Sequence, residues 1–405
     1  MTLHALLSAI ETAEDGTELR ATQMVAGQSL LERQAGLCRA AGAKLLFVSV
    51  EGMTDALVGA LDRLRAAGFV VEPVRRVSEI VDRTHARDQL MLLLDGLYAP
   101  QEQVSAFAAG PALAVFVTDD SPVTRGLERI AADQRWAGLA MTGCDMLGEL
   151  TDVPDDWDLA STVLRRAVQR GAVKLRCDPG LFETGELVVI DRAVAASAVG
   201  DRVYDAAAVG ESGLAMGNFL APLVRFAGPT VLGRGARSKP LEFGAVALAI
   251  LTIAAFSCGW LVTGAALGLT SVATAAMAHY VGLFTLEPPT PRWRMIALDL
   301  VPIVSFAALA LHLLWSDGAG WPIALLMLIY AAVLVQANAR ASSPMTNWFG
   351  RLLPDAGLGF GVIGAAALAD RTPIAIGALA LYAAAVMTYD SLSRGRESRE
   401  GFIRN

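Results

Sequence analysis

The distribution of apolar and charged residues divides the chain into two parts. Residues 243–284 contain no Asp, Glu, Lys or Arg. One membrane crossing takes roughly 20 apolar residues, so this stretch is long enough for two. The preceding residues alternate short apolar runs with charged segments, as globular domains do. The pattern therefore predicts a soluble head followed by a polytopic membrane domain.

In the first part, short apolar runs alternate with segments of helical periodicity. Strands are predicted over Thr22–Val25, Leu45–Val50, Phe69–Val71, Leu90–Leu94, Ala112–Val117, Gly138–Met141 and Leu187–Ile190. Helices are predicted over Ser29–Ala41, Thr54–Ala67, Val77–Asp88, Gln101–Ala109 and Leu159–Gln169. This alternation predicts an α/β head with three layers, in which helices cover both faces of a mostly parallel sheet.

The second part predicts an all-α membrane domain of six helices. The predicted spans are Phe243–Ser257, Trp260–Phe284, Met295–Trp315, Gly320–Ala337, Leu352–Ala369 and Pro373–Tyr389. With six spans, nearly all loop arginines and lysines fall on one side. Because positive loops stay in the cytoplasm, both termini are predicted to be cytoplasmic, in a bacterial inner membrane.

These patterns give four predicted segments. The head covers residues 1–195, a juxtamembrane linker 196–240, the six-span domain 241–391, and a basic tail 392–405. In the linker, apolar residues recur every three or four positions, among them Phe219, Leu223 and Phe226. This spacing predicts an amphipathic helix in the cytoplasmic interface. The alternative is a helix buried in the head.

Charge and cysteine content narrow the functional class. The net charge of −7 argues against nucleic acid as a partner. The four cysteines form no CxxC pair and have no histidines at metal-ligand spacing, which indicates plain thiols in a reducing compartment. The N-terminal residues lack a basic segment followed by a long apolar core, so no signal peptide is predicted.

Two predicted strands of the head end in acidic residues. Asp95 follows the strand in LLLDG, and Asp119 and Asp120 end VFVTDD. Acids at the carboxyl ends of parallel strands can hold a divalent metal together with a nucleotide phosphate. They are also ordinary turn residues that satisfy local backbone donors. We therefore take Asp95 as a candidate metal ligand.

The segment VAGQSLLERQAGLCRAAGAKLLFVSV resembles the sugar- and alcohol-phosphate nucleotidyltransferases, and LLLDGLYAP resembles the strand of that family that ends in a metal-binding aspartate. The resemblance implies a nucleotidyltransferase-like head. The family's LxAGxGxR phosphate loop and its lysine are missing, because the corresponding region is AEDGTELRATQMVAG. Glycines let consecutive backbone N–H groups converge on an anion, so the absence of a Gly-rich run predicts a degraded nucleotide site.

The six-span part, entered through an amphipathic segment, resembles the CDP-alcohol phosphatidyltransferases, some of which carry such a head. That family uses DGxxAR followed by GxxxDxxxD to bind two metal ions. Here the stretch is ATAAMAHYVGLFTLEPPTPRWRMIALDLVPI, in which only Asp299 lies near a family aspartate. Met295 and Ile303 stand where the family has glycine and a second aspartate. Two-metal catalysis needs several carboxylates. Asp299 is thus a candidate metal ligand, or a structural partner of Arg294.

Three functions remain open at this point. The first is a catalytically degraded relative of these phospholipid-synthesis enzymes, acting as a membrane subunit, scaffold or lipid-binding partner. The second is an active CDP-alcohol phosphatidyltransferase using Mg²⁺ or Mn²⁺. The third is an unrelated small transporter with a cytoplasmic head. The first predicts no catalytic residue and no cofactor. Its expected partners are membrane lipids and either a second copy of the chain or an intact member of the family.

Overall fold

The computed structural model describes residues 1–403 except 15, 17, 151–157, 210–214, 216–217, 220, 234–236, 286–291, 317–319 and 342–351. The chain forms two compact units. The first, here called the head, comprises Met1–Val203 with the short segments Leu232–Gly235 and Phe284–Pro288. The second, here called the helical unit, comprises Tyr204–Val231, Ala236–Leu283 and Pro289–Asn405.

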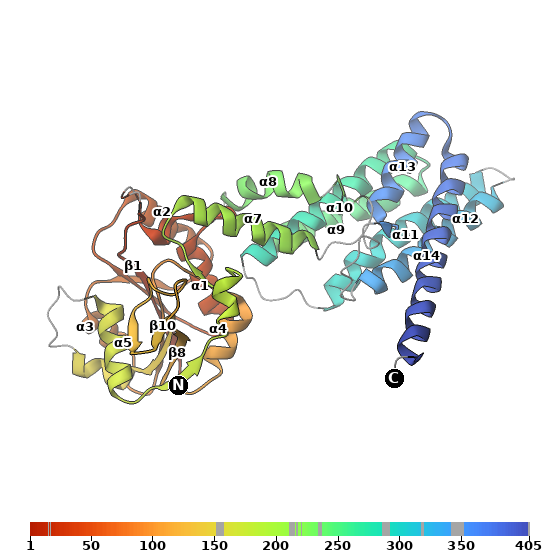
Figure 1. Ribbon diagram of the computed structural model, residues 1–405. Coiled ribbons are helices and arrows are strands. Elements are labelled where there is room, and N and C mark those ends of the chain that lie inside the picture. The colour runs from red at the N-terminus through yellow and green to blue at the C-terminus, as the bar shows by residue number, and fades with distance from the viewer. Residues whose placement is uncertain are drawn as a thin grey trace. The chain divides into compact units, whose positions relative to one another are not determined.

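An eight-stranded sheet forms the centre of the head (Figure 1). Its order is β11-β8-β10-β6-β1-β4-β5, and β9 pairs only with β10. The strands are β1 (Leu3–Ala9), β4 (Leu46–Val50), β5 (Val71–Val74), β6 (Gln89–Leu93), β8 (Ala114–Asp119), β9 (Arg129–Ala131), β10 (Gln134–Gly143) and β11 (Val173–Arg176). Only the pairs that involve β10 are antiparallel. The predicted mostly parallel sheet is confirmed.

Helices cover both faces of this sheet, so the predicted three layers are confirmed (Figure 1). Helices α1 (Leu30–Ala40), α2 (Asp55–Ala66) and α4 (Gln101–Ala108) pack on one face. Helices α3 (Val77–Val81) and α5 (Leu159–Gln169) pack on the other with the 3-10 helix Cys144–Leu150. Strand β1 shows the reason: Ala5 and Leu7 point into the first core and Leu6 into the second, because strand side chains alternate between faces.

Local sequence signals fix the starts of these helices. The Ser29 hydroxyl caps α1 by accepting from the Glu32 N–H, and the Glu32 carboxylate accepts from the Ser29 N–H, which completes a capping box. Arg63 of α2 then donates two hydrogen bonds to the same Glu32 carboxylate, at 2.9 and 3.0 Å. One acidic residue therefore both starts α1 and joins it to α2.

The central strand β1 was not predicted. Its sequence LHALLSA contains no valine, isoleucine, threonine, phenylalanine, tyrosine or tryptophan, the residues that are enriched in strands. Leucine and alanine favour helices in isolation. Pairing with β4 on one side and β6 on the other makes this segment a strand, and that tertiary effect has no local signal.

Several other predictions were wrong in extent or in place. Thr22–Val25 contributes only β2 (Met24–Val25), which forms a hairpin with β3 (Gln28–Ser29) outside the main sheet. Likewise, Leu187–Ile190 contributes β12 (Val188–Val189), which pairs with β7 (Leu97–Tyr98). The helix predicted over Val77–Asp88 ends at Val81. Asp88 instead accepts backbone hydrogen bonds from Thr2 and His85. The edge strand β11 was missed.

Among the described residues, the helical unit includes six long apolar helices after α8 (Ala221–Gly233), in agreement with the predicted all-α second part (Figure 1). They are α9 (Ser238–Ser257), α10 (Leu261–Phe284), α11 (Arg292–Ser316), α12 (Trp321–Ala341), α13 (Ala356–Leu368) and α14 (Thr372–Ile403). Among the described residues, three segments are long and apolar enough to cross a membrane: Ser238–Ser257, Leu261–Gly282 and Thr372–Tyr389. Six crossings and their orientation stay predictions.

An aromatic cluster forms the core of the helical unit. Phe306 of α11 stacks on Phe360 of α13 with ring centroids 4.6 Å apart, and it meets Tyr330 of α12 edge-on at 5.5 Å. Phe256 of α9 stacks on Phe360 from another side, at 6.2 Å. One cluster thus joins four helices that are far apart in the sequence.

Candidate functional site in the head

Asp95 lies at the carboxyl-end edge of the sheet, two residues after β6 ends. Its Oδ2 accepts hydrogen bonds from the backbone N–H groups of Ile10 and Glu11, both at 2.8 Å. Those two residues follow β1 directly. Because β1 and β6 are parallel neighbours, the segments that follow them meet at the same edge. The predicted candidate residue is thus at the predicted edge, bound to the chain's own backbone.

The surroundings of Asp95 disfavour its charged form. The side chain is 3% exposed. Burial raises the pKa of the carboxyl group to about 7, against the opposing effect of the two backbone donors and of the nearby Arg20. A carboxyl group that is substantially protonated near neutral pH is a weak ligand for a divalent cation. The contacts of Asp95 therefore fit a structural role better than a metal-binding one.

Further buried polar groups surround the segment from Leu94 to Tyr98. The side-chain amide of Gln34 donates to the carbonyl oxygens of Leu94 and Leu97, at 3.0 and 2.9 Å. The guanidinium of Arg33 donates to the Tyr98 hydroxyl at 3.3 Å and lies 4.8 Å from the centre of the Tyr98 ring. Both side chains come from α1. The first turns of α1, in the segment that resembles the nucleotidyltransferases, thus support the turn that carries Asp95.

Four buried atoms at this edge have no hydrogen-bond partner within the described part of the protein. They are Asp95 Oδ1, Gln34 Oε1, Arg20 Nε and Arg33 Nε. Two are acceptors on neutral or weakly charged groups, and two are guanidinium donors. The described residues contain no group of three or more His, Cys, Asp or Glu side chains that could hold a metal ion. This donor set suits hydrogen bonding more than coordination of a divalent cation.

The second acidic strand end is separated from Asp95. Strand β8, which ends at Asp119, is parallel to β6, but β10 lies between them. Two inter-strand spacings separate the two strands by roughly 10 Å. Their ends are also offset along β10, because Leu93 faces Leu139 and Asp119 faces Gln134. Asp120 accepts hydrogen bonds from Arg135 at 2.6 Å and Arg129 at 2.5 Å, and both arginines lower its pKa. These contacts assign Asp120 to an ion-pair network.

Asp299, the other predicted metal ligand, lies in α11, but its side chain is outside the described residues, as is that of Arg294. Both proposals for Asp299 stay predictions.

A different acidic residue of the helical unit, Asp355, has a described side chain. Asp355 caps α13 by accepting from the Leu358 N–H at 2.7 Å, and its other oxygen accepts from the Ala215 N–H at 2.7 Å.

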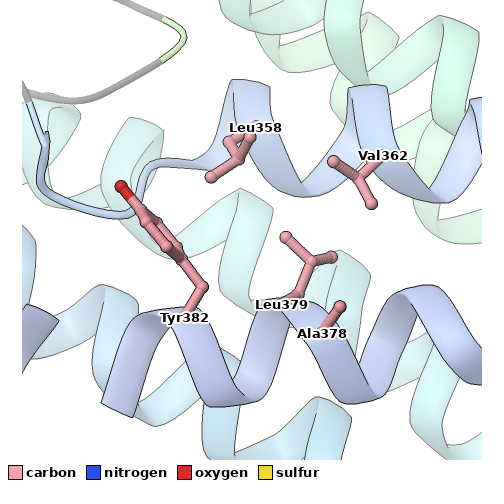
Figure 2. Close-up of a pocket in the computed structure, with 5 residues that line it drawn as sticks. All are labelled: Leu358, Val362, Ala378, Leu379 and Tyr382. Carbon is pink, nitrogen blue, oxygen red and sulfur yellow. The ribbon is translucent and has the colours of Figure 1, made fainter. Parts of the chain in front are cut away.

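An apolar pocket of about 200 Å³ lies near that cap, between α13 and α14 (Figure 2). Leu358 and Val362 line it from α13, and Ala378, Leu379 and Tyr382 line it from α14. The Tyr382 hydroxyl donates to the Leu352 carbonyl oxygen at 2.5 Å, so the one polar group in the lining is already used within the protein. The pocket therefore offers apolar contact and no chemistry.

Sequence reasoning missed the partners of Asp95. The segment Ile10–Glu11 has no loop signal of its own once β1 is missed, and Arg20 belongs to the region that lacks a Gly-rich run. One signal was available: Arg20 is the first arginine or lysine of the chain and follows the acidic stretch around Glu14. That signal alone does not show which strand the loop follows.

No protein-family model matches the chain, and no curated protein is similar to it in sequence. Solved structures are similar to the head in fold at low sequence identity. A UDP-glucose pyrophosphorylase complexed with UDP-glucose is 8% identical, with a TM-score of 0.36, over 51% of this chain and 100% of the other. An inositol-1-phosphate CTP transferase from T. maritima is 12% identical, with a TM-score of 0.35, over 46% and 96%. A nucleotidyl transferase from Methanothermobacter thermautotroptrophicus is 14% identical, with a TM-score of 0.34, over 50% and 97%.

Gly96, next to Asp95, offers a test of how tightly this edge is packed. Its φ is +75°, and an added Cβ would lie 2.9 Å from the Ile190 carbonyl oxygen and 3.1 Å from Arg20 Cδ. Gly68 has a similar φ of +83° but open space around it. Both Gly→Ala changes cost about 1–2 kcal/mol in backbone strain. We expect Gly96→Ala to be the more destabilising by at least about 1 kcal/mol, because it also forces repacking.

The measurement is the rate at which Cys38 of the full-length protein is alkylated. This thiol is fully buried in the head, so its reaction reports opening of the head. Cys258 is the exposed cysteine of the helical unit and serves as an internal standard. Equal rates in the two alanine variants would show that the edge around Gly96 is loosely packed.

Proposed function

We propose that this chain is a membrane protein whose nucleotidyltransferase-like head does not transfer nucleotides. It would act as a non-catalytic subunit, scaffold or lipid-binding partner in phospholipid synthesis. The observation that carries the proposal is the closure of the Asp95 edge. Consecutive backbone N–H groups after a strand are a favourable place for an anion. Here the N–H groups of Ile10 and Glu11 bind the chain's own carboxyl group.

The proposed loss of activity has two physical reasons. A nucleotide phosphate entering this edge would have to displace Asp95 from both backbone donors. A divalent cation would have to bind a carboxyl group whose pKa is about 7, so at neutral pH binding would also have to release a proton. Both requirements weaken nucleotide and metal binding together.

The proposed membrane location rests on the helical unit. Three of its segments have the length and composition of membrane spans. Large apolar side chains are exposed on these segments, including Leu251, Leu269 and Leu381. Such side chains would contact lipid in a bilayer. A connection to phospholipid synthesis comes from the sequence resemblance of this unit to CDP-alcohol phosphatidyltransferases.

The test is calorimetric titration of the full-length protein in lipid nanodiscs with CTP and Mg²⁺. We expect no binding tighter than millimolar. In parallel, CDP-diacylglycerol with inositol phosphate or glycerol phosphate as acceptor should release no CMP. Micromolar CTP binding that is lost in Asp95→Asn but kept in the surface variant Asp62→Asn would contradict the proposal. Metal-dependent CMP release would contradict it as well.

A further inference from the structure

Helix α8 (Ala221–Gly233) presents an apolar face that the described residues of the helical unit leave exposed. Phe226 is 88% exposed and Leu223 is 57% exposed, and Phe219, just ahead of the helix, is 71% exposed. Leu223 and Phe226 are three residues apart in α8, so they lie on one face of that helix. Exposed aromatic side chains grouped in this way mark an interaction surface.

The opposite face of α8 packs on α10. Gly228 is buried, and an added Cβ there would lie 2.9 Å from Tyr280 Cε1. Gly228 follows Phe226 by two residues, which is about 200° around a helix. One face of α8 therefore rests on α10, and the face with Phe226 points away from it.

The contact with Tyr280 shows where along α10 the helix α8 lies. Tyr280 is near the end of α10. The start of α9 is at the same level, because an added Cβ at Gly282 would lie 3.5 Å from the Ser238 Cβ. The chain from the end of α8 at Gly233 to Ser238 spans at most about 17 Å. Helix α8 thus lies beside the point where α9 begins and α10 ends.

Cationic side chains lie at the same level. Arg237 and Lys239 flank Ser238 at the start of α9, and both are exposed. Cations beside an apolar helix face complement a membrane surface that carries anionic headgroups. A soluble protein partner would not need both features at the entry of a span.

We propose that α8 is an interfacial helix that inserts Phe219, Leu223 and Phe226 into the leaflet at the start of α9, and that Arg237 and Lys239 select anionic phospholipid there. This inference rests on the spanning role proposed above for α9 and α10. It gives the protein a surface that responds to lipid charge, independent of nucleotide binding in the head.

The test uses nitroxide labels on the full-length protein in vesicles. The background variant is Cys258→Ser, since the three cysteines of the head are buried. Single labels are placed by Phe226→Cys on α8, Leu251→Cys on the α9 span and Asp62→Cys on the head. Accessibility to oxygen, which enters lipid, is compared with accessibility to a nickel chelate, which does not.

We expect the label at position 226 to be less accessible to the nickel chelate and more accessible to oxygen than the label at position 62. Its depth in the membrane should be shallower than that of the label at position 251. Vesicles of phosphatidylcholine with phosphatidylglycerol should give a greater loss than phosphatidylcholine alone, and the double change Arg237→Gln, Lys239→Gln should remove that difference. A water-exposed label at 251 would refute the membrane-spanning role itself. If the label at position 251 contacts lipid but the label at position 226 contacts water, this inference alone is overturned. The same holds if protein shields the label at position 226 from both reagents. Equal depths in both vesicle types would overturn the selection of anionic lipid.

Discussion

Replacing Asp95 by asparagine is expected to remove most of the pH dependence of head stability between pH 4.5 and 8. In an unfolded chain an aspartate has a pKa near 3.9, and in the folded head burial raises the pKa of Asp95 to about 7. Between these values the folded head holds a proton that the unfolded chain has released. The head is therefore most stable at the acid end of this range and loses stability as the pH rises to about 7.

The expected loss for the wild-type protein is on the order of 4 kcal/mol, since each pKa unit corresponds to about 1.36 kcal/mol. Asparagine does not titrate, and its side-chain oxygen can accept the same two backbone hydrogen bonds from Ile10 and Glu11. At pH 8 we thus expect Asp95→Asn to be more stable than the wild type. This result is unusual for a change at a buried polar residue.

Asp88, the other buried aspartate of the head, titrates outside this range. The backbone N–H groups of Thr2 and His85 lower its pKa to about 2. Its contribution to stability is present above about pH 4 and is lost only as the pH falls towards 2. An experiment between pH 4.5 and 8 therefore separates the effect of Asp95 from that of Asp88.

Alkylation of Cys38 gives the opening free energy of the head at each pH, after correction for the reactivity of a free thiol. The matched control is Asp62→Asn, which removes an exposed carboxylate paired with Arg65 and should leave the slope unchanged. If Asp95→Asn and wild type show the same slope, Asp95 is ionised in the folded head. The closed edge would then be a bound carboxylate, and the argument against metal binding through its protonation would fail.

The layers of the head were predictable from the sequence, because its strands and helices carry clear periodicity. Strand β6 was found as an apolar run that ends in an acid, and α1 was predicted over Ser29–Ala41 from its helical periodicity. Strand β1 was not found, since its leucines and alanines favour a helix and only the neighbours on both sides make it a strand. Missing the central strand also hid the loop that binds Asp95.

The candidate site illustrates the same limit. The position of Asp95 at a strand end follows from local pattern, but its chemistry depends on burial and on donors about 85 residues away in the chain. In the helical unit the apolar segments were predictable, and the turn at Cys258-Gly259 lies between α9 and α10 as expected. Asp355 was overlooked because the predicted fifth span, Leu352–Ala369, included it. Only the structure shows that it joins the start of α13 to Ala215.

Gly359→Val is expected to destabilise the helical unit by about 3 kcal/mol, at the upper end of the cost of overpacking a core. Gly359 lies in α13 where Phe306 and Tyr330 approach its backbone. An added Cβ would be 2.6 Å from Phe306 Cζ and 2.9 Å from Tyr330 Cε1. Relief of this clash would push Tyr330 away, and its hydroxyl would lose the 2.7 Å hydrogen bond to the Asp355 carbonyl oxygen. The change thus disturbs the aromatic cluster and the cap of α13 together.

Gly361→Val is the matched control, because Gly361 lies two residues later in the same helix with no heavy atom within 4 Å of an added Cβ. Both changes gain the same helix propensity, so their difference measures the packing of α13 against α11 and α12. The measurement is the thermal midpoint of the full-length protein in detergent. It is determined from the loss of the monodisperse size-exclusion peak after heating. A drop for Gly359→Val with little change for Gly361→Val is expected. Equal midpoints would mean that α13 does not pack on Phe306 and Tyr330, and the aromatic cluster could then not be the core that joins the helices.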